Sequence, residues 1–179
     1  MHIFLIRHLQ TNFNKNGIIQ GKLDIPIIEP NIEILQKIKV NQRLIEAEAP
    51  FDSILHSEYQ RTIMTAACYG FEQQAKVEPL LNELDFGQFE GKPRKELMTE
   101  YGELWLNEPE KIVFGESLSE LGNRISSFIN KYKDKKKILI FGHGAWMRAL
   151  YAMLYYKNIS KMNQHTIDNN TLIHMDFKV

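Results

Sequence analysis

MHIFLIRHLQTN, residues 1–12, opens the chain and sets the expectation for the fold. Its four consecutive apolar residues, 3–6, are typical of a short buried strand in a parallel sheet. The strand leads directly into Arg7 and His8 and then into polar residues. A charged pair after one strand means little by itself, so its meaning depends on whether other parts of the chain supply partners.

Two other short apolar runs, at residues 53–55 and 138–141, also end in polar groups. Arg61 follows the first run after about one helical turn, and Gly-His-Gly at 142–144 follows the second directly. The carboxyl ends of parallel strands lie at one edge of a sheet, where ligands bind. We therefore expect two histidines and two arginines to meet at that edge, namely Arg7, His8, Arg61 and His143.

Helical patterns alternate with these strands. Apolar residues recur at spacings of three and four over residues 118–132, as one buried helical face requires. Ser117 with Glu120 fits a capping box at the start of that helix, and Ser57 with Gln60 fits the same pattern before another. Both positions are therefore predicted helix starts.

The remaining elements complete an alternating order. Further helices are expected before Pro50 and over residues 145–156, and weaker strands at Val77 and over 172–177. The chain contains no repeats or linkers. These features predict one α/β domain over residues 1–179, with a mostly parallel sheet and helices on both of its faces.

Residues 81–115 differ from the rest of the chain. They mix acidic, aromatic and glycine residues, and one modest helix is expected near residues 94–101. We expect this segment to leave the sheet and to form a partial lid.

The composition excludes several classes of protein. With 22 basic and 22 acidic residues the formal net charge is zero, so no general attraction to nucleic acid or to an anionic membrane is expected. Cys68 is the only cysteine, which excludes an intrachain disulfide and suits a reducing cytoplasm. We find neither a signal peptide nor an apolar run long enough to span a membrane. We expect a cytoplasmic protein, either a monomer or a homodimer.

The expected cluster at the sheet edge indicates phosphoryl chemistry. Arginine forks and helix N-termini suit phosphate oxygens, and a histidine beside them can attack phosphorus to form a phosphohistidine that water hydrolyses. Fixed cations can stabilise such a transfer without a metal ion, and the histidines lack a third ligand at metal-site spacing. The leaving oxygen needs a proton. Glu83 and Asp85 are the nearest acidic candidates, and Glu90 is a further one.

Several stretches resemble, in the same order, the motifs of the histidine phosphatase superfamily, in the branch of cofactor-dependent phosphoglycerate mutases and small phosphatases. They are LIRHLQT (5–11), NGIIQGKLDIPI (16–27), SEYQRTIMTA (57–66), LNELDFGQFEG (81–91), GES (115–117) and FGHGAWMRAL (141–150). The resemblance spans nearly the whole chain. It implies a phosphoglycerate mutase-like fold, a three-layer α/β/α sandwich.

The resemblance also implies residue roles. His8 would be the nucleophile that becomes phosphorylated, and Glu83 would be the proton donor. The phosphoryl group and the rest of a small phosphorylated substrate would be bound by Arg7, Asn14, Gln20, Gly21, Arg61, His143 and Gly144. No metal or other cofactor is implied.

Three functions are weighed. LDFGQFEG resembles the small phosphatases, including α-ribazole phosphatases, and the short lid should admit water, so a phosphomonoesterase acting on a small metabolite is favoured. A phosphoglycerate mutase is the alternative, and an inactive phosphate- or protein-binding module is a second one. Leu9 favours the module, because the family has glycine there and a side chain could narrow the pocket or alter its loop. Gln10 replaces the usual glutamate.

Two other residues have simpler interpretations. Arg148, one helical turn after the second histidine motif, is expected to form a structural ion pair. Trp105 is expected to pack in the core, because no basic residues accompany it as in a base-stacking platform.

Overall fold

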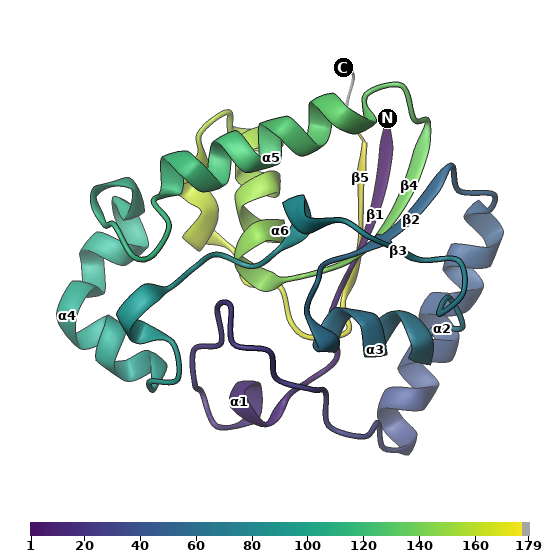
Figure 1. Ribbon diagram of the computed structural model, residues 1–179, viewed down its shortest axis with the longest axis horizontal. Coiled ribbons are helices and arrows are strands. Elements are labelled where there is room, and N and C mark those ends of the chain that lie inside the picture. Colours follow the sequence, from purple (N-terminus) through teal and green to yellow (C-terminus); the bar gives the residue numbers. More distant parts are fainter. Residues whose placement is uncertain (177–179) are drawn as a thin grey trace.

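The computed structural model describes residues 1–176, which form one five-stranded sheet with flanking helices (Figure 1). The strands are β1 (His2–Arg7), β2 (Ser53–His56), β3 (Lys76–Val77), β4 (Lys137–Gly142) and β5 (Leu172–Asp176). The α-helices are α1 (Asn12–Lys15), α2 (Ile32–Glu48), α3 (Gln60–Cys68), α4 (Arg94–Asn107), α5 (Leu118–Tyr132) and α6 (Gly144–Tyr151). A π-helical turn over Ala152–Tyr156 extends α6, and short 3₁₀ turns cover Pro79–Leu81, Gly87–Phe89, Pro109–Lys111 and Ile159–Gln164.

The strand order is β3-β2-β4-β1-β5, and only β5 runs antiparallel to its neighbour. The predicted mostly parallel α/β sheet is therefore confirmed. In the pairing of β1 with β4, Arg7 lies opposite Gly142. His8 and His143, the next residue on each chain segment, consequently leave the sheet side by side.

The sheet separates two hydrophobic layers. In β1, Ile3 and Leu5 pack into the layer beneath α5 and α6, whereas Phe4 and Ile6 pack into the layer beneath α2 and α3. Figure 1 shows these helix pairs on opposite sides of the strands. Because successive strand side chains point to opposite faces, the continuous apolar run of β1 is explained by burial on both sides.

One predicted capping box is confirmed and one is wrong. The hydroxyl of Ser117 accepts a hydrogen bond from the Glu120 N–H at the start of α5, and the Glu120 carboxylate accepts one from the Ser117 N–H. The helix α3 begins only at Gln60, with no side-chain cap. The hydroxyl of Ser57 instead lies 2.7 Å from His143 Nε2. Ser57 therefore contacts a residue distant in sequence, His143, and does not cap α3.

The off-sheet segment contains more helix than the sequence indicates. The helix α4 continues past the predicted end at residue 101 to Asn107, through a kink at Gly102, where φ is 32°. Its buried side chains Leu97 and Trp105 belong to the core, which explains why the second half is kept helical. The weak strands at Val77 and at 172–177 form β3 and β5, and residue 177 lies outside the described residues.

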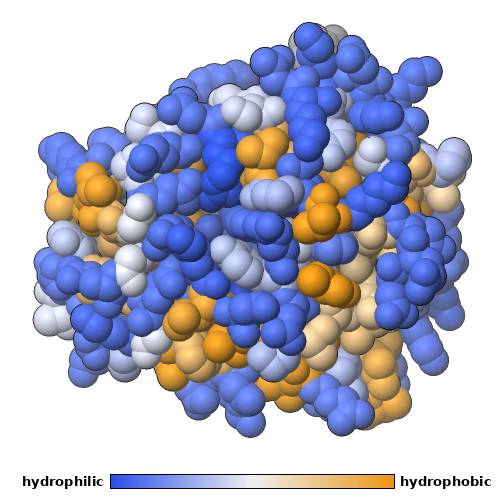
Figure 2. Space-filling model, in the orientation of Figure 1, coloured by the Kyte–Doolittle hydropathy of each residue, from blue (hydrophilic) through white to orange (hydrophobic). Residues whose placement is uncertain are grey.

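The outer surface is mixed in character. On the face seen in Figure 2, apolar side chains lie in separate patches between hydrophilic ones. No helix within residues 1–176 combines the length and the apolar character that crossing a membrane requires.

Candidate active site

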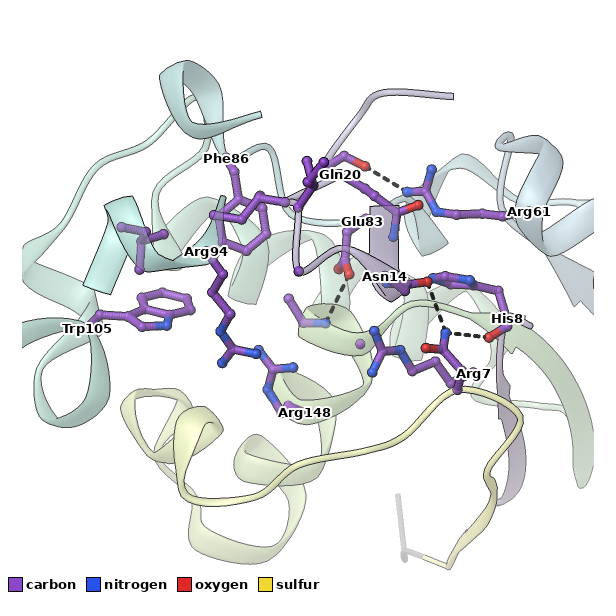
Figure 3. A pocket seen from close by; sticks show the side chains of 18 residues that line it. Arg7, His8, Asn14, Gln20, Arg61, Glu83, Phe86, Arg94, Trp105 and Arg148 are labelled. Carbon is purple, nitrogen blue, oxygen red and sulfur yellow. Dashed lines mark hydrogen bonds between the residues drawn. The ribbon is translucent and has the colours of Figure 1, made fainter. Parts of the chain in front are cut away.

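A cavity of about 270 Å³ lies at the carboxyl ends of β1 and β4 (Figure 3). Its wall is completed by the off-sheet segment through Phe86, Arg94 and Trp105. Of the predicted site residues, eight line it: Arg7, His8, Asn14, Gln20, Gly21, Arg61, Glu83 and Gly144. The ninth predicted site residue, His143, does not line the cavity.

His8 is held as a neutral imidazole with one free nitrogen. Its Nδ1 lies 2.7 Å from the carbonyl oxygen of Leu9, and because a carbonyl only accepts, Nδ1 must carry the hydrogen. The lone pair is therefore on Nε2. Burial, followed by the charges of Arg7 and Arg61, lowers the pKa of His8 well below its usual range. Such an imidazole is ready to act as a nucleophile at neutral pH.

His143 lies next to His8, with 5.4 Å between the ring centres, and is fully buried. Its Nδ1 accepts a hydrogen bond from Arg61 Nε at 3.2 Å, so its Nε2 carries the hydrogen and donates to the hydroxyl of Ser57. Burial, then the charge of Arg61, lowers the pKa of His143 well below its usual range. In this structure both ring nitrogens of His143 are bonded within the protein.

Arg61 is fully buried and anchored in a fixed orientation. Its Nη1 and Nη2 donate to the carbonyls of Leu23 and Gly21, each at 2.7 Å. Each of these nitrogens carries a second hydrogen, and the guanidinium lines the cavity. Arg61 can therefore donate to a ligand while the loop carbonyls keep it in place.

Arg7 has an unused donor. Its Nη1 donates to the carbonyl of Ile167, but its Nε is buried and has no hydrogen-bond partner among residues 1–176. A β-carbon on Gly144 would lie 3.1 Å from Arg7 Cζ, so glycine at that position lets the guanidinium lie over the start of α6. A buried N–H without a partner in a cationic wall is the expected feature of an anion-binding site.

Glu83 enters the cavity from the off-sheet segment. Its two carboxylate oxygens accept hydrogen bonds from the backbone N–H groups of Ala145 and Trp146, both at 3.1 Å. These groups are in the first turn of α6, where unpaired N–H groups favour a negative charge. Figure 3 shows the Glu83 side chain pointing into the same space as Arg7 and His8.

The other two acidic candidates are engaged away from the cavity. Asp85 accepts from the N–H of Gly87 and pairs with Lys22 at 3.1 Å. Burial opposes its ionisation, but these partners outweigh burial and lower the pKa of Asp85. Glu90 accepts from the N–H groups of Lys22 and Phe86. Neither side chain lines the cavity, so geometry favours Glu83 as the acid.

Arg124 on α5 fastens the loop that carries Glu83. Its Nη1 donates to the carbonyls of Leu80 and Asn82, at 3.0 and 2.6 Å. Its Nε and Nη2 form a two-bond ion pair with Glu116, at 2.9 and 2.8 Å. Trp146 adds a third tether through Nε1 to the Leu80 carbonyl. The position of Glu83 therefore depends on side chains distant in sequence.

Side-chain amides form a hydrogen-bond network in the cavity wall near His8. Asn14 accepts hydrogen bonds from the Thr11 N–H and from Asn169, and Asn169 also donates to the His8 carbonyl. Gln20 accepts from the Thr11 hydroxyl at 2.8 Å. The amide oxygens of Asn14 and Gln20 are thus occupied, which leaves their NH₂ groups for a ligand.

Leu9 lies outside the cavity. It is buried in the layer beneath α2 and α3, and its N–H donates to the hydroxyl of Thr65 at 2.9 Å. Its φ is not positive, so no glycine geometry is needed. Gln10 is exposed and also outside the cavity. Neither substitution narrows the site.

The sequence did not indicate several lining residues, including Arg94, Arg148 and Asn169. Arg148 forms no ion pair with any residue in the described part of the chain, so the expected structural pair is wrong. Trp105 packs against Phe86 and Phe114 as expected but also lines the cavity. An arginine about one helical turn after the second histidine motif was the available signal for Arg148.

Metal ligation was also considered. Within residues 1–176, no group of three or more histidine, cysteine, aspartate or glutamate side chains is arranged to hold a metal ion. The charge of the cavity wall comes from arginines.

Comparisons with known proteins identify the family of the chain. Residues 3–179 match the histidine phosphatase superfamily (branch 1). The chain is 29% identical to phosphoserine phosphatase 1 of Hydrogenobacter thermophilus, over 97% of this chain and 86% of that protein. It is also 29% identical to the adenosylcobalamin/alpha-ribazole phosphatase of Escherichia coli, over 86% of this chain and 79% of that protein.

Solved structures show the same fold. The alpha-ribazole phosphatase from Shigella flexneri is 27% identical, superimposes with a TM-score of 0.80, and is matched over 99% of this chain and 91% of its own. The chain therefore belongs to branch 1 of the histidine phosphatase superfamily and is a phosphatase that hydrolyses phosphoric monoesters.

Proposed function

We propose that the protein hydrolyses a small phosphorylated metabolite through a phosphohistidine at His8, without a metal ion. The observation that carries this proposal is the state of His8. Its Nδ1–H is bonded to the Leu9 carbonyl, its Nε2 lone pair is free, and the unpartnered Nε of Arg7 lies in the same cavity wall. A potential nucleophile and a potential donor to a phosphate oxygen thus lie in one cavity.

In the first step Nε2 of His8 bonds to phosphorus while the bond from phosphorus to the leaving oxygen breaks. Glu83, in its protonated form, gives that oxygen a proton and becomes a carboxylate. In the second step the Glu83 carboxylate takes a proton from water, whose oxygen attacks phosphorus and releases His8 and inorganic phosphate. Arg7 and Arg61 offset the phosphoryl charge throughout.

The remaining predicted site residues contribute to substrate binding. Asn14 and Gln20 offer their NH₂ groups, Gly21 supplies the carbonyl that orients Arg61, and Gly144 provides room for Arg7. His143 contacts the phosphoryl group once the ligand replaces one of its two present ring partners. Because Leu9 lies outside the cavity, the sequence feature that favoured an inactive module has no effect on the site.

The test is to trap the intermediate. Wild-type protein mixed with a ³²P-labelled ester and quenched in alkali should retain acid-labile label on His8. His8→Ala should abolish the label and lower turnover of an aryl phosphate by roughly 10⁴-fold or more. His165→Ala changes an exposed histidine outside the cavity and should retain both. Turnover that survives in His8→Ala would contradict the proposal.

A further inference from the structure

The helix α4 is bent sharply in its middle, at Gly102. There φ is 32° and ψ is −111°, whereas residues of an α-helix lie at about −63° and −42°. The Gly102 angles resemble those of the first central position of a type II′ turn, where glycine is the usual residue. Two helical pieces therefore meet at Gly102 and run in different directions.

Space does not explain why this residue is glycine. A β-carbon on Gly102 would have no other heavy atom within 4 Å, so a small side chain would fit there. A residue with a β-carbon would, however, rarely adopt the positive φ of this position. The bend is thus the feature that requires glycine at position 102.

The bend lets both halves of α4 contribute to the cavity wall. Leu97 in the first half and Trp105 in the second half are buried, and both line the cavity. In a straight helix, residues eight positions apart lie about 80° apart around the axis and about 12 Å apart along it. The change of direction at Gly102 instead brings both side chains to one cavity of about 270 Å³.

Trp105 closes the end of the cavity that is remote from His8. Figure 3 shows its indole at that end, across the cavity from His8. The ring packs edge-on against Phe86 and Phe114, with 6.0 and 5.5 Å between ring centres. The Trp105 backbone carbonyl accepts a hydrogen bond from Asn163 at 2.7 Å. A side chain packed and bonded in this way yields little to a larger ligand.

We propose that the bend at Gly102 places Trp105 as the end wall of the cavity, and that this wall selects phosphomonoesters by the size of their leaving group. Displacement at phosphorus is roughly in line, so the leaving group departs on the side opposite the attacking His8. Trp105 lies on that side, whereas Gly102 does not line the cavity and is a positioning residue. The proposal rests on the proposed hydrolysis at His8.

The test compares phenyl phosphate with 2-naphthyl phosphate, whose leaving groups differ by one fused ring and have leaving oxygens of similar acidity. Wild-type protein should hydrolyse phenyl phosphate with a kcat/KM at least about 10-fold higher. Gly102→Ala should lower that ratio by roughly 10-fold, chiefly through KM for the larger ester, because α4 straightens and Trp105 withdraws. Trp105→Leu shortens the wall directly and should also lower the ratio, so it tests the wall even if Gly102→Ala folds poorly.

Tryptophan emission provides a readout independent of activity. The chain has two tryptophans, and Trp146 is fully buried in the core. Withdrawal of Trp105 from its aromatic neighbours should therefore shift the emission of Gly102→Ala to longer wavelength.

Gly70→Ala is the matched control. Gly70 follows α3, its φ is 79°, and a β-carbon there would also have no heavy atom within 4 Å. The substitution imposes the same kind of backbone strain outside the cavity. It should change neither the ratio of the two esters nor the emission.

The size selection would be overturned by a wild-type protein that hydrolyses both esters equally well, or by an unchanged ratio in Trp105→Leu. A folded Gly102→Ala variant with the wild-type ratio and emission would overturn the role of the bend, as would an equal change of the ratio in Gly70→Ala. In each case continued labelling of His8 by phenyl phosphate would leave the proposed function standing. Absence of turnover and of label with both esters would overturn the two proposals together.

Discussion

The two walls of the cavity are built in different ways. At the sheet edge, strand register puts Arg7 opposite Gly142, so His8 and His143 are neighbours by backbone hydrogen bonding alone. In the off-sheet wall, Glu83 depends on side-chain tethers, from Arg124 to the loop carbonyls and from its own carboxylate to α6.

The two walls supply different chemical groups to the cavity. The sheet edge supplies buried, neutral imidazoles whose hydrogens are fixed by their neighbours. The off-sheet wall supplies Glu83, the proposed proton donor to the leaving oxygen, and the cation Arg94. We therefore expect changes in the off-sheet wall to depend on the leaving group, and changes at the sheet edge to affect every ester.

The largest effect in the off-sheet wall should come from Glu83→Gln. The variant keeps the shape of the side chain but cannot donate or accept the catalytic proton, so kcat/KM for an alkyl phosphate should fall by roughly 10²–10⁴-fold. The loss should be smaller for p-nitrophenyl phosphate, whose leaving oxygen needs no proton. Steady-state rates for the two esters measure this difference.

Asp85→Asn is the matched control for that variant. It removes a carboxylate from the same loop as Glu83. That carboxylate accepts hydrogen bonds from Gly87 and Lys22 outside the cavity. Its effect should be on stability more than on the dependence of rate on the leaving group. A rate loss equal to that of Glu83→Gln, with the same leaving-group dependence, would show that the acid has been assigned incorrectly.

A smaller effect should follow from loosening the loop with Arg124→Gln. Arg124 does not line the cavity, so we regard it as a positioning residue for Glu83. Misplacing the acid should lower kcat/KM for alkyl phosphates by roughly 10-fold and for p-nitrophenyl phosphate by less. Lys131→Gln removes another ion pair of α5, with Glu78, and should lack this selectivity. Equal losses on both esters would mean that Arg124 is merely structural.

The smallest expected effect is a change in stability, measured at the sheet edge by varying the pH. The native pKa values of His8 and His143 are lowered by burial, whereas unfolded histidine titrates near 6.5. Below that pH the unfolded chain binds more protons, so the free energy of unfolding should fall as the solution is acidified from pH 7 to 5. The slope should reach about 1.4 kcal/mol per pH unit for each histidine.

Denaturant titrations at several pH values measure that slope. His8→Gln should flatten it by about one proton, because one buried imidazole no longer resists protonation. An unchanged slope in the variant would mean that His8 is not held neutral in the native protein.

The sequence predicted the sheet edge better than the off-sheet wall. Local patterns were sufficient for the strands and for the meeting of Arg7, His8 and Arg61, because parallel strands share one edge. They were insufficient for Ser57, whose hydroxyl contacts His143 and Thr62 and does not cap α3. They were also insufficient for Arg148, which forms no ion pair in the described chain. In both cases the deciding partner lies far away in sequence.

Burial of the Leu9 side chain also decided whether this residue affects the cavity. From the sequence, a side chain in place of glycine could narrow the pocket, but the structure directs it into the layer beneath α2 and α3. The direction of one side chain depends on backbone conformation and on the space beside it, and neither is visible in a motif.

By itself the sequence determined the strand–helix alternation, the family resemblance and the prediction that His8 is the nucleophile, because apolar periodicity and motif order are local properties of the chain. Only the tertiary structure decided which nitrogen of His8 is free, which of three acids faces it, and that Arg94 and Arg148 share its cavity. These depend on hydrogen bonds and unpaired charges between segments that come together only when the chain is folded.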